Sequence, residues 1–179
     1  MNQEEKDQRD ADSDAERCEE CGFVYHLDHP AVAIQAVPAL AEEMAQLLRS
    51  QGADLRGRRE PELWSPLEYG CHLRDVFLVQ RERVLLARRV ERPALVSMGR
   101  DERVEHDGYE SQDPEDVARQ LSDAGLMFSG VLKQFGPADW EREVLYPYPE
   151  PTPRSLAWVA THTVHEARHH LMDVRRQLG

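Results

Sequence analysis

The sequence predicts an all-α fold: an antiparallel four-helix bundle preceded by a disordered acidic tail and a small Cys/His-rich segment. Helix-start signals are the first reason. SPLE at residues 65–68 combines a serine N-cap, a proline at the first helical position and a glutamate at the third, and DPED from Asp113 and TPRS from Thr152 repeat the arrangement. Apolar residues recur at helical spacing after each signal, whereas strand alternation is convincing nowhere. A chain of 179 residues suits one core, so we expect these helices to pack together.

The acidic tail comprises residues 1–17, MNQEEKDQRDADSDAER. It holds no aromatic or large aliphatic side chain after Met1, so it cannot bury enough apolar surface to offset its ordering entropy. We therefore expect this tail to be disordered.

Residues 18–30, CEECGFVYHLDHP, form the Cys/His-rich segment. Cys-x-x-Cys-Gly is typical of one half of a zinc site, because the glycine permits the tight turn around the sulfurs. Two interpretations stay open. Either the segment packs on the bundle through Phe23 and Tyr25 without an ion, or it holds a structural zinc. The predicted zinc ligands are Cys18, Cys21, His26 and His29.

Residues 31–179 contain the four expected helices and two longer connections. The first helix is less sharply bounded than the others, because Pro38 interrupts it. The connection at 137–151 holds four prolines and is expected to be irregular. The helices are expected at about 31–51, 66–89, 114–135 and 152–179.

Composition narrows the class of function. Asp and Glu number 34 against 22 Lys and Arg, and the net charge of −12 disfavours binding to nucleic acid or to anionic membranes. No signal peptide or membrane span is evident, and three cysteines do not suggest a secreted disulfide framework. We expect a cytoplasmic protein that acts on a small molecule.

The last helix carries a histidine-rich face. His165 and His169 are spaced i and i+4, so their imidazoles can converge on one ion. His162 shares this face and could be a third ligand, a base or a surface residue. The literal match of HEARH to a zinc-protease helix would make Glu166 a general base, but only ten residues follow His169 to supply a further ligand. A third ligand must therefore come from upstream or from Asp173.

The upstream candidate is His72, which lies on the inward face of the second helix. A lone histidine there is more often a core residue than a ligand, but the HxxxH pair on another helix raises the second possibility. Cys71, its neighbour, points about 100° away and is expected to be a buried small residue.

WSPLEY at residues 64–69, followed by His72 and Asp75, together with HTVHEARHH at residues 162–170, resembles the DinB-like metal-dependent four-helix bundles over residues 31–179. The resemblance implies a divalent ion, such as zinc or nickel, held by His72, His165 and His169. Known members include thiol S-transferases and thiol-dependent isomerases that use bacillithiol or mycothiol. The N-terminal CxxCGF segment resembles an actinobacterial branch, in which mycothiol would be the available thiol.

The function expected from this reading is the metal-dependent transfer of a low-molecular-weight thiol to an electrophilic small molecule, or a thiol-dependent isomerisation. Three imidazoles leave an ion with an open position, as in catalytic sites, and His162 and Glu166 are the candidate catalytic residues. The alternative is a non-enzymatic metal-binding or sensing module that contacts a protein partner. An apolar Trp/Met stripe beside the histidines is a hint of a homodimer.

Overall fold

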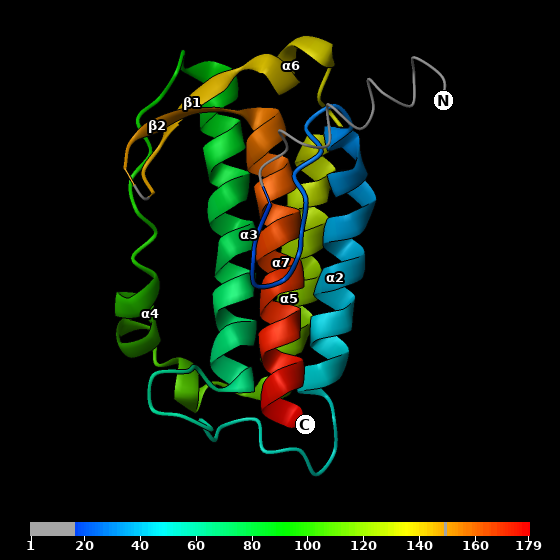
Figure 1. Cartoon of the computed structure of the whole chain (residues 1–179), viewed down its shortest axis with the longest axis vertical. Coiled ribbons are helices and arrows are strands. Elements are labelled where there is room, and N and C mark those ends of the chain that lie inside the picture. Colours follow the sequence, from blue (N-terminus) through cyan, green and yellow to red (C-terminus); the bar gives the residue numbers. More distant parts are fainter. Residues whose placement is uncertain (1–16, 149) are drawn as a thin grey trace.

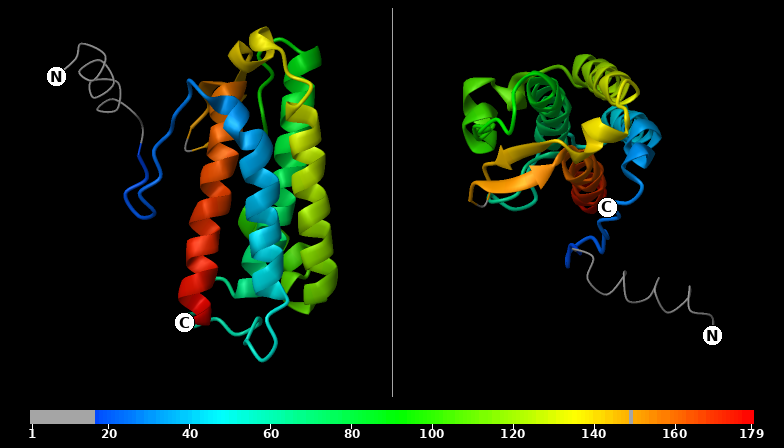
Figure 2. Two further views of the ribbon diagram at one scale, coloured as in Figure 1. Left: turned by 90° about the vertical axis from the view of Figure 1, so that its right-hand side faces the viewer. Right: turned by 90° about the horizontal axis from the view of Figure 1, so that it is seen from above.

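A computed structural model describes residues 17–148 and 150–179. Four long helices pack side by side into one bundle (Figures 1 and 2), which confirms the predicted fold class. The predicted tail lies outside the described residues, apart from Arg17. Within the described part of the chain, no helix is long and apolar enough to span a bilayer. The bundle helices are α2 (Ala33–Leu48), α3 (Pro66–Arg89), α5 (Pro114–Leu132) and α7 (Leu156–Leu178).

The helices do not simply alternate in direction. In Figure 1, α2 and α7 descend while α3 and α5 ascend. Both α2 and α3 pack against α5 and α7, so α2/α5 and α3/α7 are antiparallel neighbours and the other two pairs are parallel. The cause is the long connection from residue 90 to residue 113. It returns along the outside of the bundle and lets α5 start at the same end as α3.

The helix starts follow the local signals in the sequence. The Ser65 hydroxyl accepts a hydrogen bond from the Glu68 amide, and the Glu68 carboxylate accepts one from the Ser65 amide, so the predicted capping box is present. The Asp113 carboxylate caps α5 through the amides of Glu115 and Asp116. These caps stabilise α3 and α5 at the end of the bundle where both helices begin.

Pro38 lies inside α2 instead of marking its start. Proline has no amide hydrogen, so the carbonyl of Ile34, four residues earlier, loses its helical donor. The Ser129 hydroxyl of α5 donates to that carbonyl at 2.6 Å. A neighbouring helix thus satisfies the carbonyl that the proline leaves unpaired.

The connection between α5 and α7 differs from the sequence prediction. Beyond the short helix α6 (Pro137–Glu141), the chain forms an antiparallel hairpin of β1 (Glu143–Tyr146) and β2 (Thr152–Ser155). The predicted N-cap, Thr152, is therefore wrong by three residues, because Ser155 is the N-cap and its hydroxyl accepts from the Trp158 amide. The strands were not predicted, because proline residues in and beside them argue against a strand.

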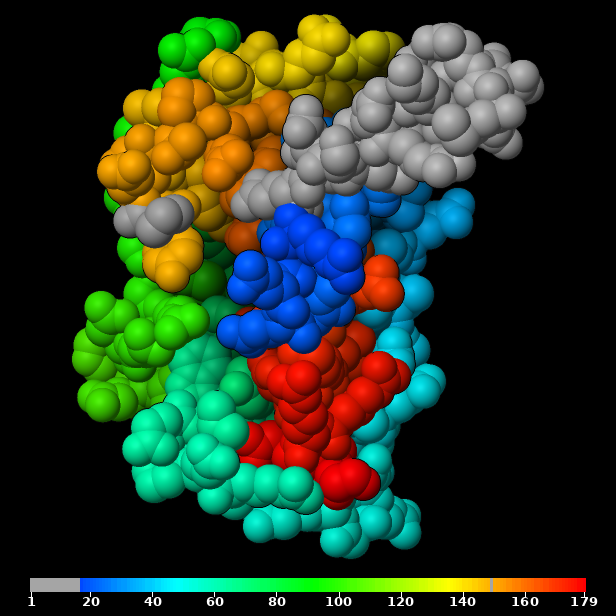
Figure 3. Space-filling model, in the orientation of Figure 1, coloured from blue at the N-terminus to red at the C-terminus, as the bar shows by residue number. Residues whose placement is uncertain are grey.

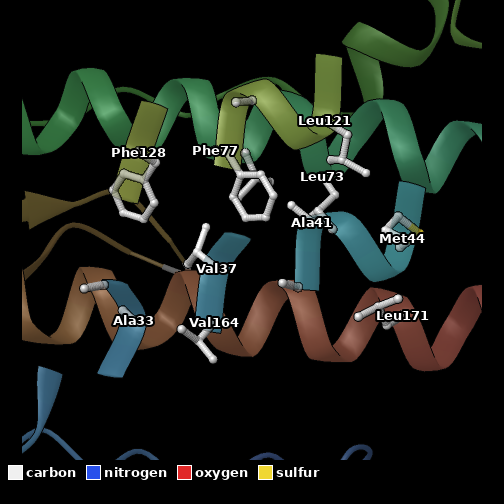
Figure 4. Packing of buried hydrophobic residues seen from close by; sticks show 14 of the residues in the cluster. Ala33, Val37, Ala41, Met44, Leu73, Phe77, Leu121, Phe128, Val164 and Leu171 are labelled. Carbon is white, nitrogen blue, oxygen red and sulfur yellow. The ribbon is translucent and has the colours of Figure 1, made fainter. Parts of the chain in front are cut away.

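The core lies between the four helices, where Phe77, Phe128 and Leu171 are almost completely buried (Figure 4). Helices α2 and α5 approach so closely that a Cβ atom at Gly125 would lie 2.8 Å from the Cβ of Ala41. Close packing of this kind fixes the rotation of each helix about its axis. That rotation decides which residues of α7 face α3.

The long connection is held on α3 by a buried carboxylate. Asp75 is 4% exposed and accepts hydrogen bonds from Arg74, from the Tyr109 hydroxyl and from Arg103 of α4 (Arg100–His106). Three donors satisfy the charge that burial would otherwise penalise. Asp75 therefore anchors the connection and pairs with Arg74.

Candidate metal centre

Helix α7 presents two pairs of potential ligands on adjacent faces. Glu166 and His170 are spaced i and i+4, as are His165 and His169, and the two pairs differ by one residue. One residue of an α-helix corresponds to about 100° of rotation. The first pair therefore faces α3, and the second faces the Cys/His-rich segment, which crosses α7 in Figures 1 and 3.

The pair that faces α3 meets His72. One potential ligand atom from each of His72, Glu166 and His170 lies within 4.8 Å of the others; we call these three residues the inner cluster. The rings of His72 and His170 are 5.1 Å apart between centroids, and Nε2 of His170 lies 3.7 Å from a carboxylate oxygen of Glu166. Two histidines and one carboxylate form a common donor set for divalent ions.

Two observations indicate that the residues of this cluster suit a metal ion. Within residues 17–148 and 150–179, Nδ1 of His72 is buried and has no hydrogen-bond partner. Buried polar atoms in proteins are nearly always paired, so an orphan of this kind indicates a missing ligand. In addition, Nδ1 of His170 lies 3.0 Å from Asp173 Oδ2, so a carboxylate orients the ring and leaves Nε2 for an ion.

The electrostatics of the inner cluster depend on burial and on close charges. Burial, together with His170, lowers the pKa of His72 to about 3, so its imidazole is neutral and can act as a ligand at neutral pH. Burial opposes the charge on His170, but the bonds to Asp173 and Glu166 outweigh it and raise the pKa to about 9. Burial likewise opposes the charge on Glu166, yet His170 and His162 hold its pKa well below the ordinary value.

Aromatic side chains enclose one side of the inner cluster. The Trp64 ring lies 4.9 Å from the His72 ring, and the Tyr69 ring lies 5.2 Å from the His170 ring. Arg100 of α4 stacks over Trp64 at 5.5 Å. Trp64 and Tyr69 thus both contact the cluster. They exclude water from His72, which is 2% exposed.

His162 lies beside Glu166 at one edge of the inner cluster. Its Nε2 lies 3.6 Å from Glu166 Oε1, and its Nδ1 lies 2.8 Å from the hydroxyl of Tyr25. The same hydroxyl lies 2.8 Å from Nδ1 of His165. Tyr25 is buried and stacks on Trp158, so the Cys/His-rich segment covers this part of α7. This part of the histidine-rich face is thus covered by a segment of the same chain.

The predicted set of three histidines is divided between two places. His72 lies in the inner cluster, whereas His165 and His169 group with Cys18 and Cys21. Among the described residues, His72 shares no ligand group with His165 or His169. The physical reason is the rotation of α7, which turns the HxxxH pair away from α3. The residues of α7 that lie beside His72 are thus Glu166 and His170, and not His165 and His169.

His170 is the residue that sequence reasoning missed. The signal for it was the spacing of Glu166 and His170, which matches that of His165 and His169. Glu166, predicted to be catalytic, becomes a potential ligand, and Asp173 becomes the partner of a ligand histidine. Glu68 is bound by Arg58 at 2.8 Å and contributes to the capping box instead.

The predicted set of Cys18, Cys21, His26 and His29 does not come together either. His26 and His29 are exposed, and His29 pairs with Asp28 at 3.1 Å. They belong to no potential ligand group in the described part of the chain. The Cys-x-x-Cys half faces α7, and two histidines of that helix stand where His26 and His29 were expected.

A groove of about 810 Å³ lies on another side of α7, between the Cys/His-rich segment and α2. Phe23, Leu40 and Leu171 contribute to its wall. None of the three residues of the inner cluster lines this groove. Its size alone therefore does not make it the place where the inner cluster would act.

Comparison with known proteins places the chain in a family. The model of the DinB superfamily matches residues 25–174. Among solved structures, YfiT from Bacillus subtilis matches with a TM-score of 0.66 and 17% identity over 90% of each chain. That protein is described as "a probable metal-dependent hydrolase with an unusual four-helix bundle topology", and at this identity the likeness shows the fold alone. Comparison with curated proteins finds no match. Because the family model spans most of its length, the chain belongs to the DinB superfamily.

Proposed function

We propose that this protein is a metal-dependent enzyme whose divalent ion is held by His72, Glu166 and His170. The observation that carries the proposal is the buried, unpartnered Nδ1 of His72 within the described residues, beside a carboxylate and a second imidazole. Most buried polar atoms have a hydrogen-bond partner, so a buried imidazole nitrogen without one favours a ligand role for His72. Membership of a superfamily that contains a metal-dependent relative supports the same conclusion.

A donor set of two histidines and one carboxylate leaves coordination positions open for a substrate. When bound, a divalent ion would supply Lewis acidity, which lowers the pKa of a thiol or water that binds beside it. The protein residues around it fix the geometry. Asp173 holds the His170 ring, while Trp64 and Tyr69 exclude bulk water from the buried side.

We propose thiol transfer as the reaction. A low-molecular-weight thiol, of which mycothiol is one candidate, loses its proton to solvent, and its sulfur forms a bond to an electrophilic carbon of the substrate. His162 Nε2, which lies 3.6 Å from Glu166, donates a proton to the leaving group or to the oxygen that receives the displaced electrons. It then regains a proton from solvent. The resemblance to thiol S-transferases supports this choice over other reactions.

Hydrolysis is the second candidate, because the similar structure of YfiT carries the description of a metal-dependent hydrolase. The same donor set would serve water as the nucleophile instead of a thiol. The two reactions share every protein residue proposed above. Only the nucleophile distinguishes them, so the assay must supply both.

The test combines metal content with activity. Metal would be measured by mass spectrometry on purified wild type, His72→Ala and His170→Ala, with His106→Ala as a matched control in an exposed position of α4. Each protein would then be assayed with an aryl halide plus mycothiol, cysteine or glutathione, and with an activated ester in water alone. We expect both cluster variants to lose about one ion per chain and their activity, and the control to keep both.

Two results would reject parts of this proposal. If folded His72→Ala keeps the full metal content of wild type, the inner cluster is not the metal site. If the metal is lost but wild type with its ion shows neither thiol transfer nor ester hydrolysis, the non-enzymatic metal-binding function replaces the enzyme. Ester hydrolysis without thiol transfer would select the second candidate.

A further inference from the structure

The Cys/His-rich segment forms a tight turn that brings two thiols together. The amide of Gly22 donates to the carbonyl of Cys18 at 2.9 Å, and the amide of Cys18 donates to the carbonyl of Phe23 at the same distance. Gly22 adopts a φ of +70°, which side chains other than glycine rarely tolerate. Both Cys18 and Cys21 are free and partly exposed. The turn presents them to α7.

Four potential ligand atoms converge there, one from each of Cys18, Cys21, His165 and His169, all within 4.8 Å of one another. We call these residues the outer cluster. Sγ of Cys18 lies 3.7 Å from Nδ1 of His169. Tetrahedral zinc, with Zn–S of about 2.3 Å and Zn–N of about 2.0–2.1 Å, separates its ligand atoms by about 3.3–3.8 Å. We propose that the outer cluster holds a structural zinc ion.

The environment of His165 supports this assignment. Its Nδ1 lies 2.8 Å from the Tyr25 hydroxyl, which can accept the Nδ1 hydrogen. Its Nε2 is buried and lacks a hydrogen-bond partner anywhere in residues 17–148 and 150–179. Metal-ligating histidines usually donate one ring N–H to a protein group and bind the ion through the other nitrogen. His165 has the arrangement that a ligand requires.

His169 shows the same division between its two nitrogens. Nδ1 faces Cys18, whereas Nε2 lies 3.3 Å from Glu20 and 3.7 Å from Asp173. A carboxylate on Nε2–H fixes the ring and increases the basicity of Nδ1. Glu20 belongs to the Cys-x-x-Cys turn itself, so the turn supplies both a thiol and the orienting carboxylate.

A redox pair is the main alternative for two adjacent thiols. A redox pair needs no imidazole ligands, and it leaves the buried Nε2 of His165 unexplained. Four donors also match a closed structural site, in contrast to the three donors of the inner cluster. The ion would staple residues 18–25, too few to fold alone, onto α7. This inference does not depend on the enzyme proposed above.

The experiment measures zinc in wild type and in variants that each remove one part of the outer cluster. Cys18→Ser/Cys21→Ser and His169→Ala should each lose about one zinc per chain. His72→Ala should keep that zinc, so failure of one site can be separated from failure of the other. His26→Ala/His29→Ala is the matched control from the same segment and should also keep it.

Cobalt provides the spectroscopic readout. Wild type that has been stripped and refilled with Co²⁺ alone should show a near-ultraviolet thiolate-to-cobalt charge-transfer band and visible bands of tetrahedral intensity. His169→Ala should lose the tetrahedral intensity. If His26→Ala/His29→Ala abolishes these bands while His169→Ala keeps them, the ion binds within the segment and the proposal is wrong.

A second measurement covers variants that fail to fold. In reduced wild type, added zinc should slow the alkylation of Cys18 and Cys21 by iodoacetamide at least tenfold. Equal rates with and without zinc would overturn the proposal. Isolation of a Cys18–Cys21 disulfide that takes up no zinc after reduction would do the same, in favour of a redox pair.

Discussion

The inner and outer clusters use adjacent residues of one helix, but they differ in the two properties that separate catalytic from structural metal sites. The inner cluster has three donors, none of them sulfur, around a nearly fully buried His72, and His162 lies beside it. The outer cluster has four donors, two of them thiols on a surface turn. Donor number and sulfur content therefore predict reactivity for the first cluster and stability for the second. The predictions below test that contrast in order of expected effect.

The largest effect concerns the three thiols. Burial raises the pKa of the Cys71 thiol to about 12, against about 9 for an ordinary thiol. At neutral pH its thiolate fraction is therefore about a thousandfold lower, and burial hinders access further. In metal-free native protein we expect iodoacetamide to label Cys18 and Cys21 and to spare Cys71, as read by peptide mass spectrometry. Unfolding in urea should make all three equivalent. Labelling of Cys71 at the same rate in native protein would contradict the model of a closed bundle core.

The second effect concerns Asp173, which lies 3.0 Å from Nδ1 of His170. Asp173→Asn keeps the shape but weakens the charge-assisted hydrogen bond that orients this ligand. Loss of such an outer partner typically lowers metal affinity by about 10–100-fold. Because Asp173 also lies 3.7 Å from His169, the zinc titration with a competing chelator would use stripped Cys18→Ser/Cys21→Ser protein, in which only the inner cluster keeps its donors. Asp116→Asn, an exposed carboxylate of α5, is the control. Unchanged affinity in Asp173→Asn would mean that this carboxylate does not support His170 as a ligand.

The third prediction compares two carboxylates, Glu68 and Glu166, of which only Glu166 belongs to a potential metal site. Glu68 is buried and bound to Arg58 and Ser65, whereas Glu166 lies in the inner cluster. Burial opposes the Glu68 charge, but Arg58 and Ser65 outweigh it and lower the pKa. Glu68→Gln should therefore reduce the free energy of unfolding by about 1–2 kcal/mol at neutral pH without loss of metal.

The sign of the pH dependence follows from that lowered pKa. The stabilisation by Glu68 is complete above the unfolded pKa, near 4.5, and is lost as the pH falls through the folded value. Urea unfolding at several pH values should show wild type and Glu68→Gln converge in acid. A constant difference at all pH values would show that the charge of Glu68 is not the cause.

The smallest effect concerns Tyr25→Phe, which removes the hydroxyl between His162 and His165. The ring still stacks on Trp158, so we expect the fold to be unchanged. Zinc affinity of the outer cluster should fall by about tenfold, the lower end of the range for loss of a ligand's hydrogen-bond partner, and the metal content of the inner cluster should not change. Competition with a chelator would measure the zinc affinity of the outer cluster, and mass spectrometry would measure the metal content of the inner cluster. A larger loss at the inner cluster would mean that the two clusters are not independent.

Most of the fold could be predicted from the sequence because the information was local. The capping box at Ser65 and the cap at Asp113 identify two helix starts without reference to the rest of the chain. The hairpin was missed because strand pairing between residues 143–146 and 152–155 is not visible in the local pattern, and four prolines in the stretch 137–151 argued against strands.

The ligand sets were harder to predict from the sequence, because they depend on the rotation of each helix about its axis. Spacing alone predicts that two residues four apart can share an ion, and α7 offers two such pairs one residue apart. The choice between them follows from the rotation of α7, which is set by how its buried residues, such as Val164 and Leu171, pack against the other helices. The partners of Cys18 and Cys21 were expected nearby in the chain, but they lie more than 140 residues away.

The alternation of the two clusters along α7 has a consequence for how this protein can diverge. Residues 165 and 169 serve one cluster, and residues 166 and 170 serve the other. One inserted or deleted residue early in the helix would rotate all four by about 100° and offer each pair to the wrong partner. Substitutions on the aliphatic face change only packing. The length of α7 is therefore under tighter constraint than its composition, and homologues that keep both clusters should differ in this helix by exchange of residues and not by gaps.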